Sequence, residues 1–491
     1  MFRWKAASIV LLAWIALTSV PVFALKYIVD NTTSSVDWKA AVWTTDPADP
    51  KENPGIVPCT PITAMRNARP GDIVFFRGGE NGSYNPAMNP DYSQPALNPS
   101  NSGTSGRPIT FRNFANETVY LKNMTAYPNT GWHHPLIGSN GRNWIIWEGF
   151  KLSGVSNAGK VNFTDASDCI LRNTEIIAVS IPSLSREQGN YDGVRIERTK
   201  RVTVQNCLIH GVDDSQNERG AGIKLYSAYN TIVEHSTFYD NDIAIFDKND
   251  GQHNTFRLNF IRTGTSTPGA AIYIGTHAGG PDTRDIKVYQ NVIVTAPGSD
   301  GIESTPIVHD LQIFNNVIYS NKGRGLNITE TTNQQYWNNI FVNATTPIRI
   351  RGRGEGMPTY SSYNAFYNGQ GFIVRDYEAD SKVYSSLAAW QGSGELIGGG
   401  NPDAQSIYAN PKFIDPGSTS PEGYKLKADS PCRKSGKDSK DMGAWPEGSL
   451  HRKTPVRAID RQSFHQSGGT SEVASASNTM LILVPNAPFH R

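Results

Sequence analysis

Lysines and a histidine recur along short apolar segments in the middle of the chain. Lys248 ends the segment 243–247, Lys224 lies one segment earlier, and His277 lies one segment later. A lysine can remove a proton from carbon where burial or neighbouring cations lower its pKa. We therefore interpret Lys248 as a candidate base, with Lys224, His277 and Tyr273 as the other candidate catalytic residues.

Cationic and aromatic residues follow the same segments and form a candidate ligand-binding set. These residues are Arg195, Tyr226, Arg257, Arg349 and Arg351. A cation that neutralises a sugar carboxylate makes the proton on the adjacent carbon easier to remove. The set therefore predicts an anionic polysaccharide as the partner and β-elimination on a uronic-acid chain as the matching reaction.

Aspartates near these residues suggest a cation site. Asp213, Asp214 and Asp242 could supply several of the oxygen ligands that a hard cation such as Ca²⁺ requires. Purely structural interpretations stand beside the functional ones. Residues 247–251 form a good polar turn between strands, the paired aspartates can solvate a loop, and His277 lies beside glycines. The sequence leaves both interpretations open.

The segments that position these residues are copies of one unit. In register they read CILRNTEII, VTVQNCLIH, TIVEHSTFY, NTFRLNFIR, IKVYQNVIV, LQIFNNVIY, QQYWNNIFV and SSYNAFY. The recurring polar position holds Asn173, Asn206, Ser236, Asn259, Asn291, Asn316, Asn339 and Asn364. A unit of roughly two dozen residues cannot bury its apolar face alone, so its copies must stack. Stacked asparagines can form amide ladders. The repeat predicts an all-β fold, a right-handed parallel β-helix.

A second strand precedes most copies and opens with small residues, as in AGIKLY and AAIYIG. Alternate residues of a strand point to opposite sides. We expect Val194/Ile196, Ile223/Leu225 and Ile243/Ile245 to point inward, and Arg195, Lys224 and Ala244 to point outward. Parallel strands lie about 4.8 Å apart, so the outward residues are expected to line one exposed strip.

The two ends of the chain differ from the repeats. Residues 1–24 carry a charged start, an apolar run and an acceptable cleavage site, which predicts a secretory signal peptide and a secreted or periplasmic protein. No later run is apolar enough to span a membrane. Residues 25–446 form the expected β-helix domain, with a short capping helix that starts at Pro61 after Thr60. The Ser-rich segment 447–491 is predicted to be a disordered tail.

Composition narrows the class of protein further. The 491 residues include 46 Lys and Arg against 44 Asp and Glu, a balance that argues against nucleic-acid binding. Four cysteines are too few for a disulfide scaffold, and we interpret Cys169 and Cys207 as buried thiols. We expect a monomer.

Three segments resemble secreted β-helix proteins of the pectate-lyase-like superfamily. They are NARPGDIVFFRGG, SGTSGRPITFRNF and DSPCRKSGKDSKDMGAW, and the likeness spans most of residues 25–446. This superfamily includes lyases, hydrolases, epimerases and adhesins, so the resemblance implies the fold more than the reaction.

A narrower resemblance concerns the segment IFDKNDGQHNTFRLNFI. It is similar to the part of the alginate lyase and chondroitinase B family that carries the basic lysine, with the pattern K-S-x-x-N-x-x-x-x-N-x-F, which implies that Lys248 is the base. The Glu-x-Glu calcium site of that family is replaced here by Asn241 and Ile243, and its arginine strand by residues 274–277.

Two other functions compete with a lyase. Polygalacturonase-like hydrolases use aspartates one turn apart, and Asp192 with Asp213 and Asp214 resembles that arrangement, although the Gly-His-Gly segment and the Arg-Ile-Lys triplet are missing. A non-catalytic carbohydrate-binding β-helix is the third interpretation. We rank the polysaccharide lyase first.

Overall fold

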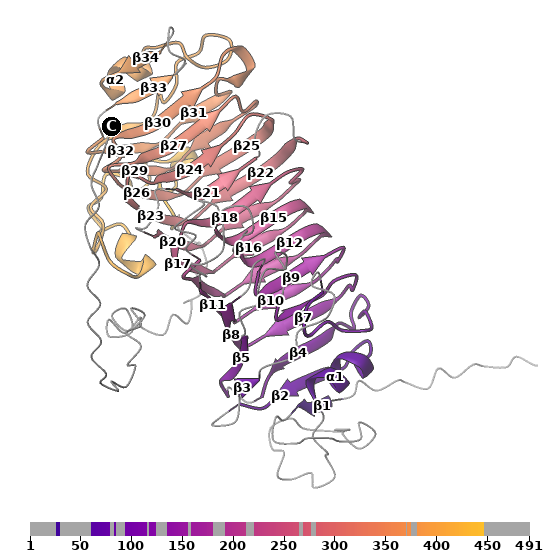
Figure 1. The fold of residues 1–491 in the computed structure, drawn as a ribbon. Helices are drawn as coiled ribbons and strands as arrows, with labels where there is room; N and C mark the ends of the chain where they lie inside the picture. Colours follow the sequence, from indigo (N-terminus) through magenta and orange to yellow (C-terminus); the bar gives the residue numbers. More distant parts are fainter. Residues whose placement is uncertain are drawn as a thin grey trace, which may run out of the picture. The chain divides into compact units, whose positions relative to one another are not determined.

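The computed structural model describes residues 26–29, 60–78, 83–84, 94–114, 117–123, 135–155, 159–179, 192–212, 220–264, 269–275, 281–369, 371–374 and 381–445. Within these ranges the strands form three long sheets, and each full turn of the chain adds one strand to each sheet (Figure 1). All strand pairs are parallel except the last pair of one sheet. The predicted all-β parallel β-helix is therefore confirmed.

Each sheet takes its strands from successive turns. Sheet 1 contains β1 (Lys26–Val29), β2 (Ile73–Phe76), β4 (Ile109–Asn113), β7 (Ile145–Glu148), β10 (Ile170–Arg172), β13 (Thr203–Gln205), β16 (Ile232–Glu234), β19 (Thr255–Arg257), β22 (Thr283–Tyr289), β25 (Val308–Phe314), β28 (Gln335–Trp337) and β31 (Tyr360–Ser362). Sheet 2 contains β3 (Ser83–Tyr84), β5 (Val119–Asn123), β8 (Phe150–Val155), β11 (Glu175–Val179), β14 (Leu208–His210), β17 (Thr237–Asn241), β20 (Phe260–Thr263), β23 (Val292–Pro297), β26 (Val317–Asn321), β29 (Ile340–Val342), β32 (Ala365–Tyr367) and β35 (Ile407–Tyr408). Sheet 3 contains β6 (Ile137–Gly138), β9 (Val161–Thr164), β12 (Asp192–Lys200), β15 (Ala221–Tyr229), β18 (Ile243–Lys248), β21 (Ala270–Ile274), β24 (Asp300–Ser304), β27 (Arg324–Thr329), β30 (Thr346–Arg351), β33 (Phe372–Val374) and the antiparallel β34 (Lys382–Tyr384).

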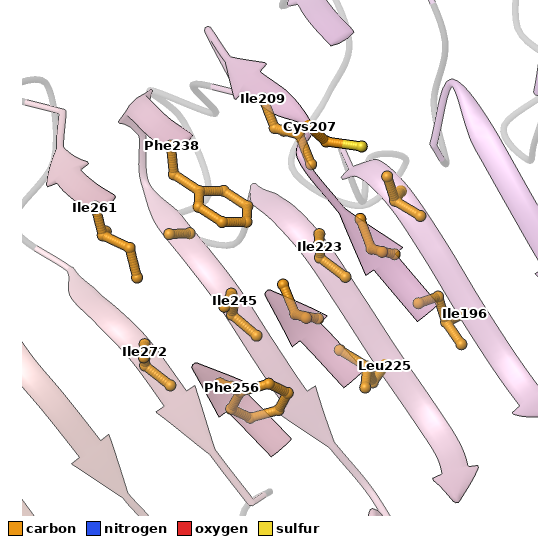
Figure 2. Close-up of a cluster of buried hydrophobic side chains, with 14 of the residues drawn as sticks. Ile196, Cys207, Ile209, Ile223, Leu225, Phe238, Ile245, Phe256, Ile261 and Ile272 are labelled. Carbon is orange, nitrogen blue, oxygen red and sulfur yellow. The ribbon is translucent and has the colours of Figure 1, made fainter. Parts of the chain in front are cut away.

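The core lies between the three sheets and is built from columns of like residues. On sheet 3, Ile223, Ile245 and Ile272 are partners on successive strands and are fully buried, as Figure 2 shows. On sheet 2, Phe238 and Ile261 stack in the same way. Burying each such side chain contributes about 1.5–3 kcal/mol relative to its exposure. The apolar period of two found in the sequence therefore fixes which face of each strand turns inward.

The predicted amide ladder is present at the corner between sheets 1 and 2. Asn259, Asn291, Asn316, Asn339 and Asn364 each donate a hydrogen bond from Nδ2 to the next residue, at 2.8–3.1 Å. The last donates to the fully buried Asp403 carboxylate, which also accepts from Trp390 Nε1 at 2.7 Å. The ladder thus ends on an anion that can accept several hydrogen bonds.

Asn173 and Asn206 were predicted in this ladder, and that register is wrong by one residue. Thr174 and Cys207 occupy the ladder position, and Cys207 N donates to Ser236 Oγ at 3.1 Å. Asn173 and Asn206 instead have φ of 53° and 52° at the corner just before it. Asparagine tolerates this left-handed conformation, so one residue type serves two adjacent positions of the repeat.

The alternation predicted for 243–245 is also wrong, because Ala244 points inward. Ala244 belongs to the core, whereas Ile243 packs with Phe246 and Tyr273 on the outer side of sheet 3. Two consecutive residues face inward where each strand enters the sheet, and the first must be small. A Cβ on Gly222, the preceding copy, would lie 3.0 Å from Phe238 Cδ1. This explains why these strands open with glycine or alanine.

Short helices and one long segment complete the described fold. Helix α1 (Pro61–Asn67) has the predicted start, with Thr60 Oγ1 accepting from Thr63 N at 3.2 Å. Helix α2 (Leu387–Gln391) brings Trp390 onto Phe372 of the last parallel strand, with ring centroids 5.4 Å apart. Three short 3₁₀ turns are η3 (Gly354–Gly356), η4 (Pro421–Tyr424) and η5 (Lys437–Ser439). The segment 407–445 carries η4 and η5 and packs on the outer face of sheet 2.

Several predictions from the sequence concern single residues or the ends of the chain. Cys169 and Cys207 are buried free thiols, as predicted. No helix among the described residues is long and apolar enough to cross a membrane. The predicted signal peptide, 1–24, and the predicted tail, 447–491, lie outside the described residues, and both stay predictions.

Candidate active site on sheet 3

The outer face of sheet 3 brings most of the predicted site residues into two adjacent rows. Row A holds Arg195, Lys224, Phe246, Tyr273, Glu303, Asn327 and Arg349, which are partners on successive strands from β12 to β30. Row B holds Glu197, Tyr226 and Lys248 on β12, β15 and β18, and further along Thr329 and Arg351. The expected strip therefore exists, with Phe246 rather than Ala244 in row A.

Lys248 lies among aromatic rings at the end of β18. Its Nζ is 5.4 Å from the centroid of the Tyr226 ring and 5.7 Å from that of Phe246. The Tyr273 ring meets Phe246 edge to face, with centroids 4.7 Å apart. Lys248 itself is half-buried. An ammonium group in this position exchanges part of its water shell for ring faces, which favours contact with a ligand at the surface.

A buried ion cluster lies next to Lys248 and includes two of the predicted residues. Asp192 and Lys224 are each 1% exposed, and Lys224 Nζ lies 2.8 Å from Asp192 Oδ1. Arg195 Nη1 lies 3.7 Å from the other Asp192 oxygen, and Arg195 Nε donates to Glu197 at 3.0 Å. Lys224 is thus a buried cation paired with Asp192 and is not exposed as a base would need to be.

Tyr226 connects the ion cluster with Lys248. The Arg195 guanidinium lies 4.5 Å from the centroid of the Tyr226 ring. Burial, followed by the charge of Asp192, raises the pKa of the Tyr226 hydroxyl well above its usual range. The hydroxyl therefore stays protonated at neutral pH and can donate a hydrogen bond to a ligand.

Arg257 was predicted with these residues, but the structure places it elsewhere. It lies on β19 in sheet 1, where Nε donates to Glu234 at 2.8 Å and Nη1 donates to Tyr289 Oη at 2.8 Å. The chain turns between β18 and β19, so residues close in sequence to Lys248 reach a different sheet. Arg349 and Arg351 do lie on sheet 3, four strands beyond β18.

The candidate cation ligands are only partly covered by the structure. Asp242 is buried, 2% exposed, immediately before β18. Asp213, Asp214 and His277 lie outside the described residues. Among the residues that are described, no group of three or more His, Cys, Asp or Glu side chains is arranged to hold a metal ion. The Ca²⁺ site stays a prediction.

Sequence reasoning missed two features of this site. Ala244 was predicted at the outward position that Phe246 occupies, because the inward pair at the start of β18 shifts the alternation. Asp192 was considered only as a hydrolytic acid, whereas the structure pairs it with Lys224 and Arg195. The recurring small residues at the start of these strands were the signal for the first feature.

Comparison with known proteins supports the fold. A family model described as a right handed beta helix region matches residues 136–304. Together with the three parallel sheets, this match shows that the protein is a right-handed parallel β-helix, as predicted. No curated protein matches the sequence.

Solved structures with the same kind of fold are similar to this chain at low identity. Pectate lyase Pel9A is 13% identical, with 81% of this chain and 94% of that chain covered and a TM-score of 0.48. The PL6 family polysaccharide lyase Pedsa3628 from Pseudopedobacter saltans is 14% identical, with coverage of 78% and 97% and a TM-score of 0.41. The GH136 lacto-N-biosidase from Eubacterium ramulus is 12% identical, with coverage of 71% and 65% and a TM-score of 0.44. These similarities concern the fold alone.

Proposed function

We propose that this protein is a lyase that cleaves a uronic-acid-containing polysaccharide by β-elimination, with Lys248 as the base. The observation that carries the proposal is the position of the Lys248 ammonium. It lies beside Tyr226 and Phe246, next to the cations of Arg195 and Lys224, on the outer face of one sheet. The rows of polar and aromatic residues could bind a long anionic chain. The predicted signal peptide agrees with a protein that acts outside the cytoplasm.

The chemistry follows from these groups. Lys248, after its ammonium group has lost a proton to solvent, takes the proton from the sugar carbon next to the carboxylate. The electrons of that C–H bond form a carbon–carbon double bond as the glycosidic carbon–oxygen bond breaks, and the departing oxygen takes a proton from solvent. Because Asp192 and Glu197 pair with Lys224 and Arg195, this cluster has no net positive charge, and the Tyr226 hydroxyl is the donor that can stabilise the negative charge developing on the carboxylate side. The protonated Tyr226 hydroxyl can hold the sugar in place.

The test is to incubate the protein with alginate, pectate and glycosaminoglycans and to follow the ultraviolet absorbance of the unsaturated product. Lys248→Met is expected to reduce the rate about 10²–10⁴-fold, the usual contribution of a positioned base. Lys287→Met is the matched control, because Lys287 lies on the outer face of sheet 1 beside Asp285. Its rate should equal that of the wild type.

Other outcomes distinguish the competing functions. New reducing ends without ultraviolet absorbance would identify a hydrolase, and binding without cleavage would identify a carbohydrate-binding protein. Full activity in Lys248→Met would remove Lys248 from the reaction and contradict the proposed mechanism.

A further inference from the structure

A second polar cluster lies on sheet 3 beyond Tyr273. Glu303 on β24 is the partner of Tyr273 on one side and of Asn327 on the other. Asp300, at the start of β24, accepts from Arg324 Nε at 2.8 Å and from Asn327 Nδ2 at 3.0 Å. Strand spacing places Glu303 about 10 Å along the sheet from the strand of Lys248. The cluster is therefore a separate position on the same face.

Asn327 in this cluster has an acceptor that needs a donor. Its side chain is buried, 5% exposed, and Nδ2 is used by Asp300. The buried Oδ1 accepts no hydrogen bond from any part of the chain that the structure describes. An unsatisfied buried acceptor costs about 1–3 kcal/mol. The neighbouring side chain in its row, Glu303, becomes a donor when it is protonated.

The surroundings of Glu303 favour that protonated form. Burial, followed by the nearby Asp300 carboxylate, raises the pKa of Glu303 to about 7, although the charges of Arg324, Arg349 and Arg351 act in the opposite direction. Tyr273 is the uncharged neighbour on β21. At neutral pH the two forms of Glu303 are therefore close to equally populated, and a charge placed beside it can shift the balance.

We propose that Glu303 and Asn327 form a proton-linked binding position for a carboxylate-bearing sugar, in which Glu303 donates its proton to Asn327 Oδ1 and meets the ligand as a neutral group. This inference rests on the proposed function, because it takes its ligand from the same uronic-acid chain. An ionised Glu303 repels a sugar carboxylate, whereas Arg349 on the next strand but one attracts it. The position therefore selects acidic sugars only while Glu303 holds its proton.

The sign of the pH effect follows from this geometry. A bound carboxylate disfavours ionised Glu303, so binding takes up a proton wherever the unliganded protein has lost it. Below about pH 6, Glu303 already holds the proton and uptake is small. At pH 8 uptake approaches one proton, and affinity falls as the pH rises through 7, by at most about tenfold per pH unit.

Calorimetry with short uronate chains tests the proposal. The Lys248→Met variant is used so that cleavage is slow during the measurement. The probes are tetrasaccharides of galacturonate, mannuronate and glucuronate. Binding is measured at pH 6 and 8 in buffers of different ionisation enthalpy. In that background, Glu303→Gln should abolish the proton uptake, make the affinity independent of pH and bind more tightly than its parent at pH 8. Glu422→Gln, which changes an exposed residue of the η4 turn, should behave like the parent.

Each contrary result has a distinct meaning. Proton uptake that persists in Glu303→Gln, or pH-independent affinity in the parent, would overturn the proton-linked position. If the wild type cleaves a uronate chain but binding takes up no proton, this inference fails and the proposed lyase function stands. If no uronate chain is bound or cleaved, both fail. Asn327→Leu should lower the pH at which affinity declines, because neutral Glu303 loses its acceptor.

Discussion

Two rows of buried polar side chains run along this solenoid, and they differ in how well their atoms are paired. In the asparagine ladder each amide donates to the next, and the last donates to Asp403. On the outer face of sheet 3, Asn327 Oδ1 is buried without a hydrogen bond in the described part of the chain, and Asp192 is held by ion pairs to unlike residues, Lys224 and Arg195. The Asp192–Lys224 contact joins residues of two successive turns at 2.8 Å.

The difference agrees with a structural role for the ladder and with the functional role that we propose for sheet 3. A repeated asparagine is satisfied by its own copies, so each new turn adds a fully paired group. Unlike residues brought into register, such as Arg195, Lys224 and Phe246, cannot satisfy one another in this way. Buried polar groups without partners are costly, and proteins keep such departures mainly where function requires them. The comparison supports sheet 3 as the site.

The largest effect is expected from breaking the ladder at its centre with Asn316→Leu. This change removes the acceptor of Asn291 N and Nδ2, at 3.0 Å each, and the donor to Val288 O at 2.9 Å. Asn291 Nδ2 keeps its bond to Phe256 O at 2.9 Å, but Asn291 N and Val288 O each lose a partner inside the core, which should reduce the free energy of unfolding by about 5 kcal/mol. Urea unfolding measures the loss. Cleavage by the protein that remains folded should keep its rate, since the ladder is distant from sheet 3's outer face.

A loss below about 1 kcal/mol in Asn316→Leu would show that the ladder contributes little beyond its neighbours. The asparagine ladder could then no longer be described as the row that stabilises the fold.

The second prediction concerns Asp247, an interior acid directly before Lys248. It is fully buried, accepts from Asn254 Nδ2 at 2.9 Å, and burial raises its pKa to about 7. Between pH 3.8 and 7 the folded state holds a proton that the unfolded state has lost, so stability falls as the pH rises through that window. Asp247→Asn should therefore be more stable than the wild type by up to about 4 kcal/mol at pH 8, and similar to it near pH 4.

Unfolding in urea at the two pH values checks this sign. Equal stability of Asp247→Asn and the wild type at pH 8 would mean that the Asp247 carboxylate finds a compensating partner. The Asp247 carboxylate would then resemble that of Asp403, which ends the ladder, rather than the unpaired groups.

The third prediction tests the ion cluster with Lys224→Met. Removing the cation leaves the buried Asp192 carboxylate with Arg195 alone, 3.7 Å away. Breaking a buried pair by removing one partner should cost about 3 kcal/mol. The double variant Asp192→Leu with Lys224→Met should recover most of that loss, because no buried charge is then unpaired. Additive losses in the double variant would contradict the paired arrangement.

The sequence predicted the architecture well because the repeat displays its period directly. Aliphatic residues at every second position, with an asparagine at the corner of most turns, leave few other ways to bury the apolar faces. The register of the repeat was harder to predict, because asparagine fits both the ladder position and the left-handed position just before it, as at Asn206. At β18 the inward pair Ala244 and Ile245 shifted the predicted rows, because the small residue where the strand enters its sheet was counted as an outward position.

The site was less predictable than the fold. Lys248 and Tyr226 could be placed on one face by counting, but their contact depends on the shifted register. Arg257 is close to Lys248 in sequence but lies on another sheet, because the chain passes a corner of the β-helix between β18 and β19. The pairing of Asp192 with Lys224 joins different turns, and no single segment of sequence contains it.

The smallest effect is expected where an ion pair is exposed. Arg284 Nη2 lies 3.2 Å from Asp282 Oδ2, with 50% and 45% of the two side chains exposed. Water and salt screen such a pair, so Arg284→Ala should change the free energy of unfolding by less than about 1 kcal/mol. Urea unfolding at low and high salt measures it. A loss as large as that of Lys224→Met would mean that burial does not govern the value of ion pairs in this solenoid, and the contrast between paired and unpaired rows would need another explanation.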